Sequence, residues 1–417
     1  MKIAIIGSGI SGLGAAYLLN PDHDITVYEK NDYIGGHSRT ITASTQTGST
    51  PTDTGFIVFN KKNYPHLTAL FELINAPIVK SDMSFGVSIK NAWLEYGSKS
   101  IFAQKKNFFR PQFWQMIFNI LKFNQNAKKY LEKKPNASLE QCLDDMKFGK
   151  WFREYYLQAM GAAIWSCSAE TILKFPAQSF INFFENHGLL TINNHPQWYS
   201  VDGGSKEYVS RLTESFLHKI KLNTPIHSVS KLDNKKLEIT TQDKQSEQFD
   251  AVIFACHADE ALKINKVHAN HAQKLLESFQ YQDNQIIVHT DDSFMPHNRD
   301  AWASWVYLSD NNDNDNNKSV SLTYWMNNLQ NLQTSQNIFV TLNPGRMPDA
   351  SKIIDTHTFS HPVFDKDAVA AQKQLNTIQG QDGIYYCGAY QRYGFHEDGL
   401  LSAVRVAKTL GTKIPWE

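Results

Sequence analysis

Three residues near the C-terminus, His396, Glu397 and Asp398, place groups that transfer protons side by side in the stretch GFHEDGLLSA, residues 394–403. A histidine changes charge near neutral pH and a carboxylate accepts a proton, so both suit acid–base work on a bound substrate. Asp398 followed by Gly399 also fits an ordinary helix N-cap, because the residues that follow have helical spacing. The choice between these roles depends on which elements lie beside this stretch.

The N-terminus carries a motif that binds phosphates. Residues 2–6, KIAII, form a short apolar run typical of a strand buried on both faces, and GSGISG separates it from a helical pattern. The next expected strand, DITVYEK, brings Glu29 to its end. This order of strand, glycine turn, helix, strand and acid predicts a dinucleotide-binding βαβ unit.

Each residue type in the motif has a physical task. Gly7 permits the tight turn, Gly9 lets the backbone approach a pyrophosphate, and Gly12 lets the helix pack on the strand. The helix N-terminus offers unpaired N–H groups to the phosphates. Glu29 can accept both ribose hydroxyls of an adenosine, and its charge disfavours the 2′-phosphate of NADP.

Two further segments identify the dinucleotide. GGHSRT, residues 35–40, follows shortly after Glu29, and TDTGFIVF, residues 52–59, comes next. Together they resemble the flavin-containing amine oxidoreductase superfamily, which includes amine oxidases, carotenoid desaturases, protoporphyrinogen oxidase and a fatty-acid isomerase. The resemblance implies FAD as the cofactor. His37 stands where many members carry an arginine, so phosphate pairing is expected from Arg39, two residues later.

Later segments resemble the same superfamily in order and spacing. WYSVDGGSKEYVSRL resembles the superfamily's Gly-Gly turn before a helix, and IKLNTPIHSVSKL resembles its adenine-side strand. FDAVIFACHADEAL resembles the strand that returns to the flavin, and GIYYCGAYQRYGFHEDGLLSAVRVAKTL resembles the C-terminal motif. In the last, the resemblance places a helix N-terminus at the flavin N1/O2 edge, where its dipole stabilises the negative charge of the reduced ring. The residues expected to contact FAD are Gly7, Ser8, Gly9, Ile10, Ser11, Gly12, Glu29, Lys30, Gly35, Gly36, His37, Ser38, Arg39, Thr54, Gly55, Phe56, Ile226, Ala255, Gly388, Asp398, Gly399, Leu400 and Leu401.

The resemblance implies an α/β fold in which a discontinuous, Rossmann-like FAD-binding domain carries an inserted α+β substrate domain. The FAD-binding domain is expected at residues 1–72, 196–262 and 368–417. The substrate domain is expected at residues 73–195 and 263–367. An antiparallel sheet in its second part is predicted by the runs QIIVHT, AWASWVYL, SVSLTYWM and NIFVTL. The polar stretch DNNDNDNNK, residues 310–318, is expected to be a loop.

Composition limits the partners and the compartment. The chain has 417 residues and a formal net charge of +0, so no global field attracts nucleic acid. Its 4 cysteines are widely spaced, with no pattern of metal ligands, which indicates reduced thiols, a cytoplasmic protein and no metal site. We also find no uncharged apolar run long enough to span a bilayer.

The type of flavoenzyme is indicated by departures from the superfamily pattern. Amine oxidases of this superfamily usually place a lysine near flavin N5, and that position falls here on Gln285, with Asn284 beside it. One position of the aromatic cage that grips an amine is occupied by His396. Both changes argue against a simple amine oxidase. Segments such as DTGFIVFNKKNYP and TYWMNNLQ are more similar to a branch of bacterial FAD-binding proteins associated with fatty-acid modification.

The sequence therefore predicts an FAD-dependent oxidoreductase that transfers a hydride from a hydrophobic, fatty-acyl or lipid substrate to flavin N5, in a desaturation, oxidation or isomerisation. Two alternatives stay open: a peroxide-producing amine or amino-acid oxidase, and a non-catalytic FAD-binding partner of a lipid-modifying enzyme. For His289, Asp291 and Trp325, hydrogen bonding at a strand end or core packing is the favoured role. The candidate catalytic and pocket residues are His396, Glu397, Asn284, His289, Asp291 and Trp325.

Residues 101–130 mix aromatic and aliphatic side chains with Lys and Arg, and apolar residues recur at helical spacing beyond Pro111. Such a basic, aromatic helix fits a peripheral contact with an anionic membrane, here the inner face. Packing of the same helix on its own domain is the favoured interpretation.

Overall fold

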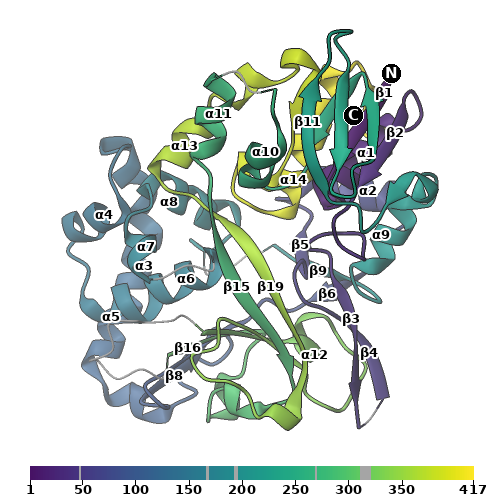
Figure 1. Ribbon diagram of the computed structural model, residues 1–417. Coiled ribbons are helices and arrows are strands. Elements are labelled where there is room, and N and C mark those ends of the chain that lie inside the picture. Colours follow the sequence, from purple (N-terminus) through teal and green to yellow (C-terminus); the bar gives the residue numbers. More distant parts are fainter. Residues whose placement is uncertain (47, 166–168, 192–195, 268–269, 310–320) are drawn as a thin grey trace.

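The computed structural model describes residues 1–46, 48–165, 169–191, 196–267, 270–309 and 321–417 (Figure 1). The architecture is mixed α/β, as expected, with one parallel sheet, several antiparallel sheets and a separate group of helices. The polar stretch at residues 310–318 lies outside the described residues.

A five-stranded parallel sheet forms the centre of the first lobe, which also contains both ends of the described chain (Figure 1). Its apolar strands come from distant parts of the chain, and the central ones are buried on both faces because helices and a second sheet cover them. In spatial order the strands are β10 (Ile220–Lys221), β2 (Asp24–Tyr28), β1 (Lys2–Ile6), β14 (Ala251–Phe254) and β20 (Ile384–Tyr386).

The two faces of this sheet are covered differently. One face packs against the helices α1 (Ile10–Leu19), α2 (Pro65–Leu73), α9 (Lys206–Thr213) and α14 (His396–Thr409). The other face packs against an antiparallel sheet and three helices, namely β11 (Ile226–Lys231), β12 (Leu237–Thr241), β13 (Ser246–Phe249), α10 (Ala258–Ile264), α11 (Asn270–Glu277) and α13 (Lys366–Gln372). Two small sheets extend this lobe: β3 (Thr40–Thr45) with β4 (Gly48–Asp53), and β5 (Val58–Asn60) with β9 (Trp198–Val201) and β6 (Ile78–Ser81).

A seven-stranded sheet organises the second lobe. The four strands predicted there are present, although one of them, β16, pairs in parallel with β7 rather than only antiparallel with its neighbours. In spatial order the strands are β19 (Ile353–Val363), β15 (Gln280–His289), β18 (Phe339–Leu342), β17 (Ser321–Trp325), β16 (Trp305–Ser309), β7 (Phe85–Ile89) and β8 (Leu94–Gly97). The long strands β15 and β19 run side by side through the middle of the molecule and join the two lobes (Figure 1).

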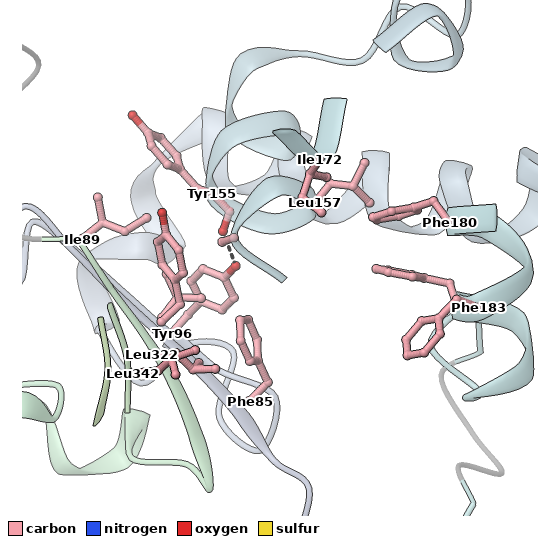
Figure 2. Close-up of a cluster of buried hydrophobic side chains, with 14 of the residues drawn as sticks. Phe85, Ile89, Tyr96, Tyr155, Leu157, Ile172, Phe180, Phe183, Leu322 and Leu342 are labelled. Atoms are coloured by element: carbon pink, nitrogen blue, oxygen red, sulfur yellow. Dashed lines mark hydrogen bonds between the residues drawn. The ribbon is translucent and has the colours of Figure 1, made fainter. Parts of the chain in front are cut away.

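Helices form the outer part of the second lobe, on the left in Figure 1. They are α3 (Pro111–Lys133), α4 (Leu139–Asp145), α5 (Lys150–Phe152), α6 (Ala159–Trp165), α7 (Ala169–Leu173) and α8 (Ala177–Asn186), with the short α12 (Met326–Leu329) beside the sheet. Side chains from the sheet, such as Phe85, face side chains from the helices, such as Phe180, in one aromatic-rich cluster (Figure 2). The Tyr96 hydroxyl, which is buried in this cluster, donates to the Tyr155 carbonyl at 2.6 Å.

The described cysteines Cys142, Cys256 and Cys387 are free thiols. Among the described residues, no helix is long and apolar enough to cross a bilayer.

A buried carboxylate holds the C-terminal helix α14 against α2. Glu397 is 4% exposed, and its two oxygens accept the backbone N–H groups of His66 and Leu67 at 3.0 and 2.9 Å. Those N–H groups belong to the first turn of α2, whose own hydrogen bonds leave them free. Burial raises the pKa of Glu397 to about 7. The predicted catalytic role of Glu397 does not fit this position, because its carboxylate caps a helix instead of facing a substrate.

Replacing Glu397 with glutamine is expected to flatten the pH dependence of stability. The folded-state pKa of about 7 lies above the ordinary value of 4.5. The folded state therefore binds more protons than the unfolded state between these pH values, and the free energy of unfolding falls as pH rises. This contribution, at most about 1.4 kcal/mol per pH unit, is absent from Glu397→Gln. Denaturant unfolding across this pH range measures it. The exposed Glu132→Gln is the control, and an unchanged slope in Glu397→Gln would refute the assignment.

Candidate functional site

The first glycine turn connects β1 to α1 and is open at one position only. Gly7 has a φ of +109°, and a Cβ there would lie 2.8 Å from the Ala255 carbonyl oxygen. A Cβ at Gly12 would lie 1.9 Å from the Gly7 carbonyl oxygen. A Cβ at Gly9 would meet no atom within 4 Å, so the turn presents bare backbone to open space there. Ile10 and Ser11 form the first turn of α1, whose N–H groups face the same space.

Glu29 lies at the end of β2, beside this turn. Its Oε2 accepts the Ser8 backbone N–H at 2.9 Å and the Ser8 hydroxyl at 2.6 Å, and its Oε1 accepts the Asn31 N–H at 2.9 Å. The Glu29 carbonyl accepts the N–H of Thr224 at 2.8 Å, two residues before Ile226 begins β11. The acid and the expected adenine-side strand are therefore neighbours.

A second loop, residues 35–39, rests on the first. The Gly35 N–H donates to the Ser8 carbonyl at 3.0 Å, and a Cβ at Gly36 would lie 3.0 Å from the Gly9 Cα. The carbonyl of His37 accepts the N–H of Phe56 at 2.8 Å. The loop at Thr54 and Gly55 is joined in the same way, since the Thr54 N–H donates to the Arg39 carbonyl at 2.9 Å, and a Cβ at Gly55 would lie 2.2 Å from the His37 carbonyl oxygen.

The C-terminal segment packs against the glycine turn and completes the set of segments at this end of the sheet. A Cβ at Gly399 would lie 2.8 Å from Ile10 Cγ2 and 2.9 Å from Ser11 Oγ, so the N-termini of α14 and α1 touch. Asp398 Oδ2 accepts the backbone N–H groups of Tyr393 and Phe395. Phe395 is the N-cap residue of α14, so Asp398 caps the helix from its first turn and not from the N-cap position that the sequence suggested. Burial raises the pKa of this carboxyl to about 6. Further along the same segment, Gly388 donates its N–H to Ser402, Leu400 contacts Gly14, and Leu401 continues α14.

These segments fit an FAD molecule. The open backbone at Gly9 and the N-terminus of α1 would hold the pyrophosphate, and Glu29 would hold the ribose. The N-terminus of α14 would supply the dipole for the flavin edge. His37 adds a polar group to the same region, because its buried Nε2 has no hydrogen-bond partner.

Two of the residues expected at the cofactor have other partners. Arg39 forms a bidentate pair with Asp355 of β19, with N–O distances of 2.7 and 3.2 Å. The structure thus gives Arg39 a carboxylate where the sequence predicted a phosphate, and the pair ties the second loop to the long strands. Lys30 pairs with Glu260 at the surface.

His396 lies at the meeting point of three segments. Its Nε2 is 2.7 Å from the Tyr208 hydroxyl and 3.2 Å from Ser38 Oγ, and its ring stacks on Phe56 with centroids 3.8 Å apart. Burial lowers the pKa of His396 to about 3, so the ring is neutral at neutral pH. This arrangement suits a residue that holds the site together rather than one that carries a proton.

A group of histidines that the sequence analysis did not predict stands beside the second loop. The ring of His37 lies 5.3 Å from His361 and 6.2 Å from His257, and it stacks on Phe359 at 4.5 Å. Burial lowers the pKa of each of these histidines and of His357, and that of His361 falls to about 4. The signal was present in THTFSH, where positions 357, 359 and 361 share one face of a strand. No group of such side chains in the described ranges is arranged to hold a metal ion.

Asn284 belongs to this histidine group. It is fully buried on β15, its Nδ2 lies 2.8 Å from His361 Nδ1 and donates to the Gln282 carbonyl, and its Oδ1 accepts from Asn343. The neighbouring Gln285 is exposed. The position at which the sequence analysis looked for a lysine, Gln285, is thus exposed, and its inward-facing neighbour is an asparagine.

Three other predicted residues are not brought to the site. His289 stands five residues along β15 from Asn284, about 16 Å away for an extended strand. It donates to Thr341 at 2.7 Å, while Asp291 pairs with Lys352 at 3.2 Å. Trp325 donates to Asn337 and packs on Trp302. The structure thus shows strand-end hydrogen bonds for His289 and Asp291 and packing for Trp325, the roles that the sequence analysis favoured.

A parallel sheet with a glycine turn, an acid after the next strand and a second helix N-terminus at one edge is the arrangement of a dinucleotide-binding fold. The chain belongs to the flavin-containing amine oxidoreductase family, whose model matches residues 10–336. It is accordingly an FAD-dependent oxidoreductase. No curated protein sequence gave a significant match.

Solved structures share the fold over nearly the whole chain. A putrescine oxidase variant superposes with a TM-score of 0.70 at 14% identity, covering 98% of both chains. Cyclohexylamine oxidase from Brevibacterium oxydans gives 0.70 at 13% identity, covering 98% of this chain and 99% of the other. A fatty acid isomerase from P. acnes gives 0.62 at 15% identity, covering 97% and 98%.

Alanine at Gly9 is expected to leave the fold intact and weaken FAD binding. Its Cβ has free space and the backbone φ of −69° suits alanine, but the methyl group points to the surface expected to meet the pyrophosphate. Flavin titration should show a loss of affinity of at least about ten-fold, with an unchanged melting temperature of the apoprotein. Gly12→Ala, whose Cβ would collide with Gly7, should instead destabilise the protein itself. Unchanged flavin affinity in Gly9→Ala would place the pyrophosphate elsewhere.

Proposed function

We propose that this FAD-dependent oxidoreductase acts on a hydrophobic, fatty-acyl type of substrate, in an oxidation, desaturation or isomerisation. The observation that carries the proposal is an aromatic wall that reaches the N-terminus of α14 from the helical lobe. Phe183 of α8 stacks on Phe395, the residue before α14, with centroids 5.2 Å apart. Trp165 lies 4.7 Å from Phe183 and 5.4 Å from Phe175. An apolar chain is the ligand that such a wall favours.

A small pocket continues this wall to the histidine group. It lies between α6, α7 and the ends of β15 and β19, and is lined by Trp165, Thr171, Phe175, Gln282, His361, Pro362, Val363 and Phe364. His361 therefore faces two environments, the apolar pocket and His37 of the second loop. The cavity holds only about 10 Å³, room for about one water molecule, so an acyl chain enters this space only if the surrounding side chains move. His361 would then be the polar group that orients a substrate whose remaining surface is apolar.

The hydrogen bonds fix the protonation of His361. Asn284 presents its amide nitrogen to His361 Nδ1, because its Oδ1 already accepts from Asn343. Nδ1 is then the acceptor, and the neutral ring carries its proton on Nε2. An Nε2–H donor suits a carbonyl or carboxylate oxygen, the polar group of an acyl chain. We assign His361 to orienting the substrate and Asn284 to holding His361.

Bound FAD would supply the two-electron acceptor for this chemistry. The residues of the chain then have three tasks. The aromatic wall excludes water, His361 holds the polar end of the substrate, and the neutral, hydrogen-bonded His396 keeps the second loop, α9 and α14 in register.

An amine oxidase is the second candidate, because several of the similar structures are named as oxidases of putrescine or cyclohexylamine. The inward-facing Asn284 and the His361 donor do not favour it. A protonated amine needs acceptors or anions, whereas the Nε2 of His361, a residue that lines the pocket, carries an N–H donor. The carboxylates of Glu397 and Asp398 are already occupied by backbone N–H groups.

The substrate class is tested by anaerobic reduction of the FAD-loaded protein. Long-chain fatty acids and acyl esters are expected to bleach the flavin or to be converted with altered double bonds, detected by mass spectrometry of the lipids. A panel of primary and secondary amines and amino acids is expected to leave the flavin oxidised. Bleaching by amines with peroxide release in air would establish the amine oxidase instead. Inertness to both panels would favour the non-catalytic partner subunit.

The role of His361 is tested by His361→Phe, which keeps the ring and removes the donor. The apparent KM for the acyl substrate should rise by about ten-fold or more, because one hydrogen bond to a charged or strongly polar group is lost, while flavin content and spectrum stay unchanged. Asn284→Ala should reproduce part of this effect, since it frees the His361 ring. His271→Phe on the exposed side of α11 is the matched control. A fall in kcat at constant KM would show that His361 acts in the chemical step.

A further inference from the structure

An exposed group of aromatic and basic side chains lies on the helical lobe, at the start of α3. We call it the aromatic–basic patch and define it as Lys105, Lys106, Phe108, Phe109, Arg110 and Phe118. Phe108, Phe109 and Phe118 are 55%, 81% and 63% exposed. They are the only phenylalanines among the large exposed apolar residues of the described chain. Exposed rings gathered in one place mark an interaction surface.

Hydrogen bonds from two neighbouring side chains fix the backbone of the patch. The preceding 3₁₀ turn spans Lys105–Phe109, and its buried Asn107 donates to the Glu95 carbonyl at 2.8 Å. Trp114 of α3 donates to the Phe108 carbonyl at 2.9 Å, and its ring lies 5.6 Å from that of Phe108. The backbone that carries Phe108 and Phe109 is thus already ordered, which lowers the entropy cost when a partner covers these residues.

The stretch of chain that carries these rings has charges of one sign. Between Glu95 and Glu132 the chain carries no Asp or Glu, whereas it carries Lys99, Lys105, Lys106, Arg110, Lys122, Lys128 and Lys129. Lys99 and Lys128 are neutralised by ion pairs with Asp82 and Glu185. No ion pair of Lys105 or Lys106 occurs within the described residues, and both are exposed. A chain of formal net charge +0 thus concentrates free positive charge where its aromatic side chains are exposed.

We propose that the aromatic–basic patch docks the protein on an anionic lipid surface. Aromatic rings enter the headgroup region while Lys and Arg meet the lipid phosphates, a combination typical of interfacial binding. A second copy of this chain fits less well. A symmetric contact would place two positive patches against each other, and that repulsion opposes association.

The patch also joins the interior that the proposed function uses. Trp114 packs on Phe102 at 5.2 Å, and Phe102 packs on Phe113 of the core. That core is the same aromatic-rich cluster that contains Phe183 and Phe395. Docking does not depend on the proposed function. If the substrate is an acyl chain, docking would bring the enzyme to the membrane in which such chains are found.

Co-sedimentation of the FAD-loaded protein with vesicles tests the docking. Vesicles of phosphatidylcholine with phosphatidylglycerol should bind the protein, and pure phosphatidylcholine should bind it much more weakly. Lys105→Glu/Lys106→Glu should weaken partition to the anionic vesicles by about ten-fold or more, since each basic residue near the surface contributes about 1 kcal/mol. Phe109→Ser should weaken partition to the anionic vesicles as well, by removing an inserted ring. Added salt should reduce the effect of the lysines.

Matched controls change the same residue types elsewhere. Lys274→Glu/Lys373→Glu alters exposed lysines on α11 and after α13, and Leu217→Ser removes an exposed apolar side chain from the other lobe. Both should bind vesicles like the wild type, and all variants should keep their flavin. Equal partition of Lys105→Glu/Lys106→Glu and the wild type would overturn the proposal, as would equal binding to both vesicle types. A concentration-dependent dimer that Phe109→Ser abolishes would reassign the patch to a second copy.

Discussion

The close approach of two helix N-termini, those of α1 and α14, is the constraint on which the flavin lobe depends. Gly399 lies against the side chains of Ile10 and Ser11, and Gly14 lies against the side chain of Leu400, so at each contact one helix contributes only a glycine and the helices approach closely. Two sets of free N–H groups and two positive dipole ends therefore point at one region. Positive potential concentrated in one region raises the free energy of the folded protein unless a bound anion compensates it. A dinucleotide with a pyrophosphate and a ring that becomes negative on reduction is such an anion.

Buried polar groups keep this geometry, and several of them connect segments far apart in the chain. Asp53 is 1% exposed and binds Thr40, the backbone N–H and hydroxyl of Ser205, and Gln330 of the second lobe. Burial raises its pKa to about 6. The Arg39–Asp355 pair makes a second link between the lobes. The two lobes are thus held by specific hydrogen bonds as well as by the continuous strands β15 and β19.

The sequence predicted the parts of the fold in which local pattern and position coincide. KIAII, GSGISG and DITVYEK became β1, the turn and β2 because their residue types admit few other structures. The role of Glu397 was missed because its partners, His66 and Leu67, are over 300 residues away and no local signal identifies them. His361 was missed for a related reason. Its alternation with Phe359 is visible, but only the pairing of β19 with β15 shows that this face turns toward Asn284. Which residues contact FAD and which act on the substrate stays a prediction.

The order of the strands has a consequence for biosynthesis. The central strand β1 pairs with β14, which lies about 250 residues later, and β14 pairs with β20, beyond residue 383. A chain that leaves the ribosome N-terminus first must keep one edge of β1 uncovered until most of the protein has been made. The helix that completes the flavin lobe comes after β20. The nascent chain therefore exposes apolar strand edges for much of its synthesis, and α14, whose N-terminus is predicted to face the flavin, emerges after all the strands of this sheet.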